Sequence, residues 1–149
     1  MVQAFLIVGV IAIALLTWSL LRRFADDSLQ QFTNRRRDSS RLVSRGEFVD
    51  GNRHLPVALA LSPSAFYYEN AGMQASVDLE LIEEIEYENE LSTGHTVGEG
   101  RVLRLRCFSQ TFEFILPDET LAQWKSVLPA QRHQAAGKVM SGELLGRTA

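Results

Sequence analysis

Apolar residues follow three distinct patterns along this chain, and each pattern is typical of one kind of structural element. The first is an uncharged run of 20 residues from Val2 to Leu21, followed at once by Arg22 and Arg23. At about 1.5 Å per residue, a helix of that length spans about 30 Å, the thickness of the hydrocarbon core of a bilayer. Because no basic side chain precedes the run and no clear cleavage site follows it, we expect an uncleaved transmembrane helix over residues 1–23.

The second pattern is the alternation of apolar and polar residues in short runs between residues 46 and 116. The run "RVLRLRC" alternates Leu103 and Leu105 with two arginines, and "AFYYEN" and "TFEFIL" show the same period of two. Gly, Asn and Pro residues separate these runs. Such a series predicts antiparallel β-strands with one face in a core and the other in solvent.

The third pattern has helical spacing and follows the last of these runs. Pro117 ends the run and Asp118 is a suitable N-cap. Leu121, Trp124 and Leu128 then recur on one helical face. We expect this helix to cover an open end of the sheet, with the Trp124 indole inserted into the core.

The acidic stretch "ELIEEIEYENE" at residues 80–90 fits a strand better than a helix. In a helix its glutamates would repel one another at spacings of three and four, and the segment holds no base to offset them. In a strand, Ile85 and Tyr87 point inward and the alternate glutamates point outward. An antiparallel register in which paired residue numbers have an even sum then places these glutamates on the same face as Arg104 and Arg106.

The order of these elements resembles the pleckstrin-homology-like (PH-like) superfold, in its GRAM and bacterial PH-like forms, across residues 46–128. The residues that carry the resemblance are the strand–turn–strand unit "VALALSPSAFYYEN", the transition "SVDLELIEEIEYEN", a hairpin and a final helix with a tryptophan. The resemblance implies an α+β, mainly β fold, in which a bent seven-stranded antiparallel sheet, a barrel or sandwich, is capped by the C-terminal helix. It also implies a binding or scaffolding module without catalysis.

These patterns divide the chain into four expected parts. A transmembrane helix at 1–23 is followed by a basic juxtamembrane linker or short helix at 24–45, which alternatively extends the first helix. The PH-like domain occupies 46–129, and a flexible tail occupies 130–149.

Basic residues concentrate directly after the apolar run, and acidic residues lie farther on. The membrane-proximal basic group comprises Arg22, Arg23, Arg35, Arg36 and Arg37. Because Lys and Arg favour the cytoplasmic side of a span, we expect the N-terminus outside the cell membrane, the C-terminal domain in the cytoplasm, and the arginines beside anionic lipid, not nucleic acid. Residues 46–130 carry fourteen acidic and five basic side chains, a balance that would hold the domain away from an anionic surface.

Two surfaces are candidates for binding. The first is an outward acidic row that, with the glycine-rich loop at residues 94–100, would face a basic protein partner; it comprises Glu84, Glu86, Glu88 and Glu90. The second follows from the resemblance, because family members that bind phosphoinositide headgroups carry several bases in the first strand–loop–strand. The corresponding bases here are Arg45, Arg53 and His54, interspersed with Glu47 and Asp50.

No pattern of catalytic, metal-binding or cofactor-binding residues stands out. The carboxylates at residues 78–84 lack the spacing of an EF-hand loop, and the three histidines and one cysteine lack the spacing of a zinc site. The loop at residues 94–100 lacks the Lys-Ser/Thr ending of a P-loop, and Cys107 alternates with leucines as a core residue does. We therefore expect no enzyme activity, no cofactor and no metal.

The sequence thus predicts a single-pass, membrane-anchored cytosolic PH-like module that mediates protein–protein interaction as a scaffold. Two alternatives stay open at this point. One is a PH- or GRAM-like domain that senses membrane lipid, and the other is a small accessory subunit of a larger membrane complex.

Overall fold

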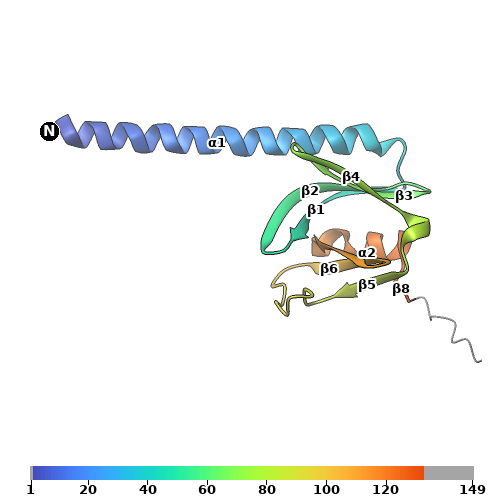
Figure 1. The fold of residues 1–149 in the computed structure, drawn as a ribbon. Helices are drawn as coiled ribbons and strands as arrows, with labels where there is room; N and C mark the ends of the chain where they lie inside the picture. The colour runs from blue at the N-terminus through green and yellow to red at the C-terminus, as the bar shows by residue number, and fades with distance from the viewer. Residues whose placement is uncertain (1, 133–149) are drawn as a thin grey trace, which may run out of the picture.

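The apolar run and the polar segment after it form one unbroken helix, α1 (Val2–Arg37), in the computed structural model, which describes residues 2–132. The N-terminal part of α1 projects away from the rest of the molecule, whereas its C-terminal part lies over the strands (Figure 1). The alternative in which the segment after residue 23 extends the first helix is therefore the one observed.

The prediction of a transmembrane helix over residues 1–23 is wrong. Within the described part of the chain, no helix is both long enough and apolar enough to cross a membrane. The apolar run is the beginning of a longer helix that becomes charged from Arg22 onward and carries three arginines in its last turn. The length of the uncharged run predicted an anchor, but that length does not show where the helix ends or what its later turns pack against.

The predicted seven-stranded antiparallel sheet is confirmed, and a two-residue strand extends it at one edge. The strands are β1 (Leu42–Asp50), β2 (Arg53–Leu61), β3 (Ala65–Asn70), β4 (Met73–Asp78), β5 (Glu84–Glu88), β6 (Arg101–Cys107), β7 (Gln110–Leu116) and β8 (Gln131–Arg132). A one-turn 3₁₀ helix, η1 (Leu79–Leu81), joins β4 to β5. The strand order is β4-β3-β2-β1-β7-β6-β5-β8, so β1 and β7 join the two halves.

The register predicted for the acidic strand is also confirmed. β5 pairs with β6 so that Ile85 lies opposite Leu105 and Glu86 opposite Arg104. Ile85, Leu105 and the neighbouring Leu103 are buried, which places the alternate glutamates and arginines together on the other face.

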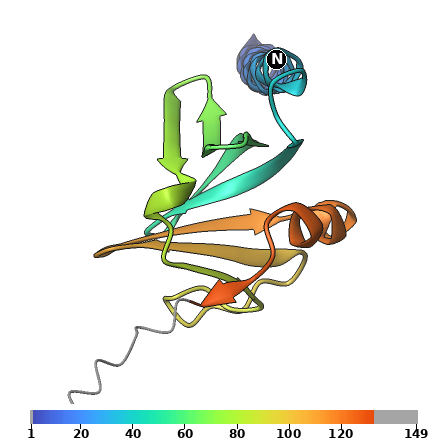
Figure 2. The ribbon, with the colours of Figure 1, turned by 90° about the vertical axis from the view of Figure 1, so that its right-hand side faces the viewer.

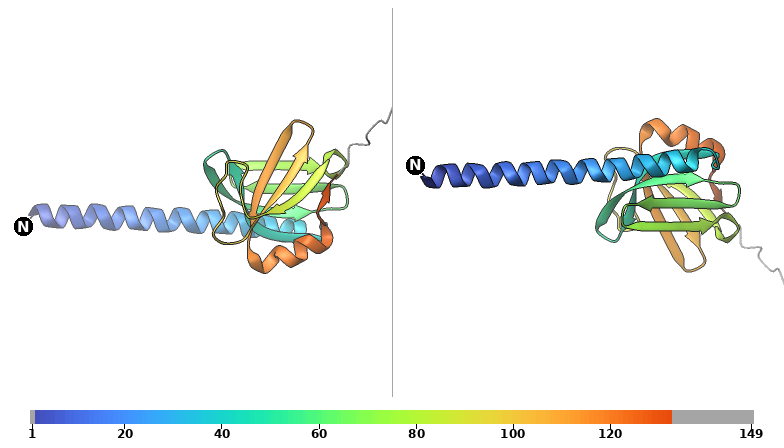
Figure 3. Two further views of the ribbon diagram at one scale, coloured as in Figure 1. Left: turned by 90° about the horizontal axis from the view of Figure 1, so that it is seen from below. Right: turned by 90° about the horizontal axis from the view of Figure 1, so that it is seen from above.

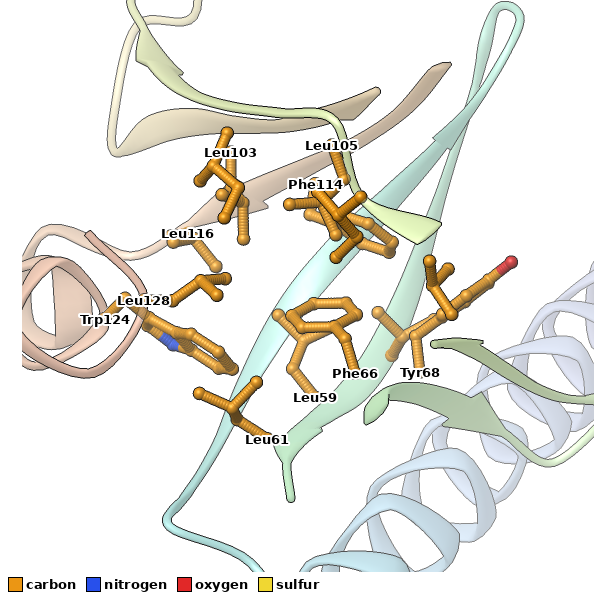
Figure 4. Packing of buried hydrophobic residues seen from close by; sticks show 14 of the residues in the cluster. Leu59, Leu61, Phe66, Tyr68, Leu103, Leu105, Phe114, Leu116, Trp124 and Leu128 are labelled. Atoms are coloured by element: carbon orange, nitrogen blue, oxygen red, sulfur yellow. The ribbon is translucent and has the colours of Figure 1, made fainter. Parts of the chain in front are cut away.

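The sheet bends so that its two halves face each other, and α2 (Asp118–Val127) closes one side of the space between them (Figure 2). The Trp124 side chain on α2 is fully buried in the core, as predicted. Around it pack side chains from both halves, among them Phe66 and Phe114, whose ring centroids are 5.0 Å apart (Figure 4). The expected N-cap is wrong, because the capping position is Pro117 and no side chain caps the helix there.

A second helix layer, which the sequence patterns did not predict, covers the outer face of the first half-sheet. Leu29 and Phe32 of α1 are buried against Ala58 and Ala60 of β2, and the C-terminal part of the helix lies over the strands in the view from above (Figure 3). Two alanines at alternate positions of β2 leave the shallow surface that lets a helix approach a sheet closely. The fold is therefore a helix, a bent sheet and a capping helix in sequence order.

Candidate binding groove

A network centred on Glu113 fixes the loop that connects β5 to β6. The Glu113 carboxylate on β7 is 6% exposed and accepts hydrogen bonds from the backbone N–H and the hydroxyl of Ser92, each at 2.9 Å. It also accepts a bond of 2.9 Å from Nε of Arg104. A buried carboxylate is costly without partners, and these three bonds supply them. The two bonds from Ser92 also hold the loop against the sheet.

Arg104 extends this network to β5 and to the start of the loop. Its Nη1 donates to the Glu86 carboxylate at 3.3 Å, and its Nη2 donates to the backbone carbonyl of Glu90 at 2.9 Å. Burial by itself lowers the pKa of the Arg104 guanidinium, but the hydrogen bonds and charges of Glu113 and Glu86 raise that pKa overall. One arginine thus joins β7, β5 and the loop.

The loop itself is tightly hydrogen-bonded over residues 89–100. Backbone bonds run from Leu91 N–H to the His95 carbonyl and from Val97 N–H to the Asn89 carbonyl, each 2.9 Å. At its end, Gly100 N–H donates to the Asp118 carboxylate of α2 at 3.4 Å. The loop therefore has a defined conformation beside the first turn of α2.

Two adjoining cavities lie between this loop, the β1–β2 hairpin, α1 and the start of α2. Their volumes are about 550 Å³ and 580 Å³, and both are lined by Glu47, Glu99 and Ile115, so we treat them as one surface, the acidic groove. The carboxylates along it are Asp26, Glu47, Glu99, Asp118 and Glu119. Its apolar lining includes Leu91, Val97, Pro56, Ile115, Leu116 and Pro117.

Two of the three bases expected to hold a lipid headgroup lie beside acidic side chains along this groove. Arg45 lies 3.4 Å from the Asp26 carboxylate and donates to the Gln30 side chain at 3.1 Å, both on α1. The His54 ring lies 3.2 Å from the Glu47 carboxylate. Arg53 lies opposite an acidic residue, Asp50, across the β1–β2 turn. The structure does not bring these three side chains together into one basic site.

The acidic row predicted on β5 is only partly exposed. Glu84 is 8% exposed and lies 2.6 Å from Arg106, and Glu86 is engaged by Arg104. Glu88 and Glu90 are exposed. Half of this row therefore stabilises the β5–β6 pair, and only its last two members lie in solvent.

The arginines after the apolar run also differ in their surroundings. Arg36 lies 3.1 Å from the buried Glu69 carboxylate of β3, and its guanidinium carbon is 3.9 Å from the centroid of the Tyr67 ring. Arg23, Arg35 and Arg37 are exposed, and Arg22 lies within α1. Sequence reasoning missed the structural role of Arg36, since it depends on a partner 33 residues away.

The groove residues were missed for the same reason. Asp26, Glu99 and the acidic start of α2 come from separate segments, and no local spacing in the sequence relates them. Over residues 2–132, no group of three or more His, Cys, Asp and Glu side chains is arranged to hold a metal ion. The acidic groove is therefore a concave surface that is anionic and partly apolar.

Comparison of the chain with protein-family models, curated proteins and solved structures finds no match.

Proposed function

We propose that this chain is a non-catalytic, PH-like protein-binding module that holds a basic segment of a partner protein in the acidic groove. The observation that carries the proposal is the charge of the groove lining. Five carboxylates line it, and two bases of its lining, Arg45 and His54, each lie beside one of those carboxylates. A concave surface of one charge sign attracts ligands of the opposite sign and steers their approach.

The apolar part of the lining supports a peptide ligand over a free cation. Ile115 and Leu91 lie among the carboxylates, so a bound segment could bury apolar side chains while its Lys or Arg side chains meet the acids. Interfaces between proteins typically combine an apolar centre with a polar rim. The groove has both components within a single concavity.

The architecture supports the PH-like part of the proposal. The bent antiparallel sheet and its closure by α2 are the features that the sequence resemblance implies. In such a fold the rigid sheet positions loops that carry the binding residues. Here the hydrogen bonds of Ser92 to Glu113 and of Gly100 to Asp118 position the β5–β6 loop before any ligand binds.

The proposal is tested by neutralising two exposed groove carboxylates, with Glu99→Gln and Glu119→Gln in one variant. The probe is a fluorescent peptide of alternating Lys and Leu, and its Kd is measured by anisotropy at physiological salt. We expect the double variant to bind at least tenfold more weakly, because each lost charge removes an attraction that the groove focuses. An unchanged Kd would overturn the proposal.

A matched control removes the same charge elsewhere. Glu80→Gln with Glu88→Gln neutralises two exposed carboxylates that do not line the groove, and we expect less than a twofold change. Equal losses in both double variants would indicate attraction to the net charge of the protein, not to a site. Binding of a soluble inositol phosphate that is lost in Arg53→Gln would favour the headgroup alternative instead.

A further inference from the structure

The first half of the sheet ends in a strand whose outer edge is open. Among the described residues, β4 pairs with β3 alone, whereas the edge of β5 at the other end of the sheet is covered by β8. β4 is the outermost strand of its half, and the β6–β7 turn extends past it on the same side (Figure 2). An uncovered strand edge presents backbone N–H and C=O groups with which another strand can pair.

The hydrogen bonds of β4 show which of its residues face that edge. At the end of the strand, the N–H of Leu79 donates to the carbonyl of Ser64, just before β3, at 2.9 Å. Because such bonds alternate along an antiparallel pair, the odd-numbered residues of β4 bond to β3. The backbone groups of Gln74, Ser76 and Asp78 therefore point to the open edge.

The sequence of this edge lacks the features that commonly keep edge strands from pairing. β4 reads "MQASVD", with one charged residue, Asp78, and with no lysine or proline. Its register with β3 runs from Met73 to Asp78 without a bulge. Lysine, proline and bulges are the usual protection of an exposed edge, so the β4 edge is suited to pairing with a further strand.

An apolar cavity lies directly beside the same edge. It has a volume of about 320 Å³ and lies between β4, η1 and the β6–β7 turn, with Val77, Leu81 and Phe108 in its lining. We call it the Leu81–Phe108 cavity. Leu81 is 46% exposed and Phe108 is 69% exposed, more than any other large apolar side chain among residues 26–132. Phe108 also adopts φ = 50°, so the chain holds an aromatic ring in solvent where the backbone favours Gly or Asn.

The β4 edge is complementary to itself. When two copies of β4 pair antiparallel about a two-fold axis at Ser76, the two Ser76 residues lie opposite each other, and Gln74 lies opposite Asp78 of the second copy. These are the residues whose backbone groups point to the edge, so the hydrogen bonds of the two strands match. Paired residue numbers have an even sum, so Val77 lies opposite Ala75 on the core face. No like charges are opposed.

The same register covers the cavity and brings opposite charges together. It places Met73 of the second copy opposite Leu79, at the start of η1 and next to the cavity. Arg35 of α1 lines a cavity of about 370 Å³ beside the β3–β4 turn, and in the pair this turn comes next to the exposed Asp78 and Glu80 of the other copy. Exposed charges of this kind add little affinity, but they favour this register over others.

We propose that this chain forms a homodimer in which two β4 strands pair antiparallel across a two-fold axis at Ser76 and join the two sheets into one. Met73 of each copy covers the Leu81–Phe108 cavity of the other. The interface is the same patch on both copies, so association stops at two. No residue of β4 lines the acidic groove, so the dimer and the proposed function are tested separately.

A disulfide cross-link tests the position of the two-fold axis. Opposed residues of a hydrogen-bonded antiparallel pair have Cα atoms about 5.5 Å apart, a separation that a disulfide spans. The full chain with Ser76→Cys is oxidised mildly at micromolar concentration, and denaturing electrophoresis quantifies the covalent dimer. We expect at least tenfold more dimer than with Ser126→Cys, an exposed position on α2. Both variants retain Cys107, which is 8% exposed, and equal yields would overturn the proposal.

Opposite charges at the same position test the symmetry of the pair. Ser76→Asp and Ser76→Lys each oppose like charges in a dimer of one variant, whereas a mixture of the two opposes unlike charges. We expect each variant alone to dimerise at least tenfold more weakly than wild type by sedimentation, and native mass spectrometry of the mixture to show mainly the mixed dimer. Ser126→Asp and Ser126→Lys should dimerise as wild type does. A mixed dimer at no more than its statistical share would contradict the two-fold axis.

Ser76→Pro separates the interface from the fold. Because the Ser76 N–H points away from β3, proline there removes a bond to the second copy and none to β3, and edge strands tolerate proline at such positions. We expect Ser76→Pro to keep the circular dichroism spectrum of wild type and to be monomeric where wild type is dimeric. Association that persists in Ser76→Pro would assign it to another surface, such as the exposed apolar side chains of α1, and overturn the proposal. A wild-type chain that stays monomeric up to high micromolar concentration would also overturn it.

Discussion

The indole N–H of Trp124 donates a hydrogen bond to the hydroxyl oxygen of Ser44, 2.8 Å away, and so joins α2 to β1 across 80 residues of chain. Both side chains are buried, and the Ser44 hydroxyl in turn donates to the Arg45 carbonyl at 3.3 Å. This bond attaches the capping helix to the sheet within the apolar core that surrounds the indole.

Removing the indole or the hydroxyl should destabilise the fold in both cases, and the loss of the indole should cost more. Trp124→Ala should lower the free energy of unfolding by about 3–5 kcal/mol, because it opens a cavity in the core. Ser44→Ala should cost about 1–3 kcal/mol, because it leaves a buried indole N–H without an acceptor. Urea unfolding measures both, and Ser126→Ala, an exposed position on the same helix, should change the value by less than about 0.5 kcal/mol. A Ser44→Ala effect no larger than the control would contradict the role of the bond.

Arg104 and Arg106 of β6 should differ in the same way. Arg104→Met leaves the buried Glu113 without its base and should cost about 3 kcal/mol. Arg106→Met should cost about 1 kcal/mol, because the Arg106 side chain is 48% exposed and water replaces much of its interaction with Glu84. Urea unfolding compares the two, and equal costs would show that the Glu113 network does not fix the loop.

Stability should fall at high pH through the partly buried phenol of Tyr87. Burial raises the pKa of Tyr87 above its ordinary value of 10.0, so the folded state retains this proton where the unfolded state has lost it. The contribution is therefore complete below about pH 10 and is lost as the pH rises above it. Burial also raises the pKa of Tyr68 and of the Cys107 thiol, which act in the same direction.

The measurement is the free energy of unfolding between pH 8 and pH 11. Tyr87→Phe should reduce the decline with pH, and at neutral pH it should cost about 1 kcal/mol through the lost bond to the Leu128 carbonyl. An identical decline in wild type and variant would assign the pH dependence to other groups.

The sheet and its capping helix could be predicted from the sequence because their signals are local. The alternation around Leu103 and Leu105 and the helical spacing of Trp124 each show which face is buried. The β5–β6 register followed from one further fact, that opposed residues in an antiparallel pair share a face. These features need no knowledge of distant partners.

The first helix and the groove could not be predicted in the same way. Nothing near Arg36 in the sequence indicates Glu69, and nothing near Asp26 indicates Arg45, because both pairs form only when α1 packs on the sheet. The apolar run at the start of α1 matched the length of a membrane span, and that single strong signal outweighed the weaker pattern of Leu29 and Phe32 that marks the docked part. The groove combines segments that only the folded sheet brings together.

Two glycines with positive φ should respond very differently to alanine. Gly100 has φ = 81°, and a Cβ there would lie 2.2 Å from the Leu116 carbonyl oxygen, so Gly100→Ala should cost about 2–4 kcal/mol. Gly51 has φ = 59° with nothing within 4 Å of a Cβ, so Gly51→Ala should cost about 1 kcal/mol from the backbone conformation alone. Urea unfolding distinguishes them, and similar costs would mean that β6 can move away from β7 at little expense.

The docking of α1 on the sheet should depend on Arg36 and not on its neighbour. Arg36→Met leaves the Glu69 carboxylate, 5% exposed, with the Gln74 amide at 3.1 Å as its side-chain partner among the described residues, and it also removes the charge over the Tyr67 ring. We expect a cost of about 2–3 kcal/mol for this loss. Arg35→Met, at an exposed position, should change stability by less than about 0.5 kcal/mol.

Hydrogen exchange shows where that cost appears. Because the contacts of Arg36 hold the helix to β3 and contribute little to the core beneath the sheet, amides of α1 from Ser28 to Arg37 should exchange faster in Arg36→Met, while those of β6 and β7 keep their protection. Uniformly faster exchange would instead mean that α1 and the sheet unfold as one cooperative unit. The orientation of the projecting helix would then be set by the whole fold, and not by the Arg36–Glu69 pair.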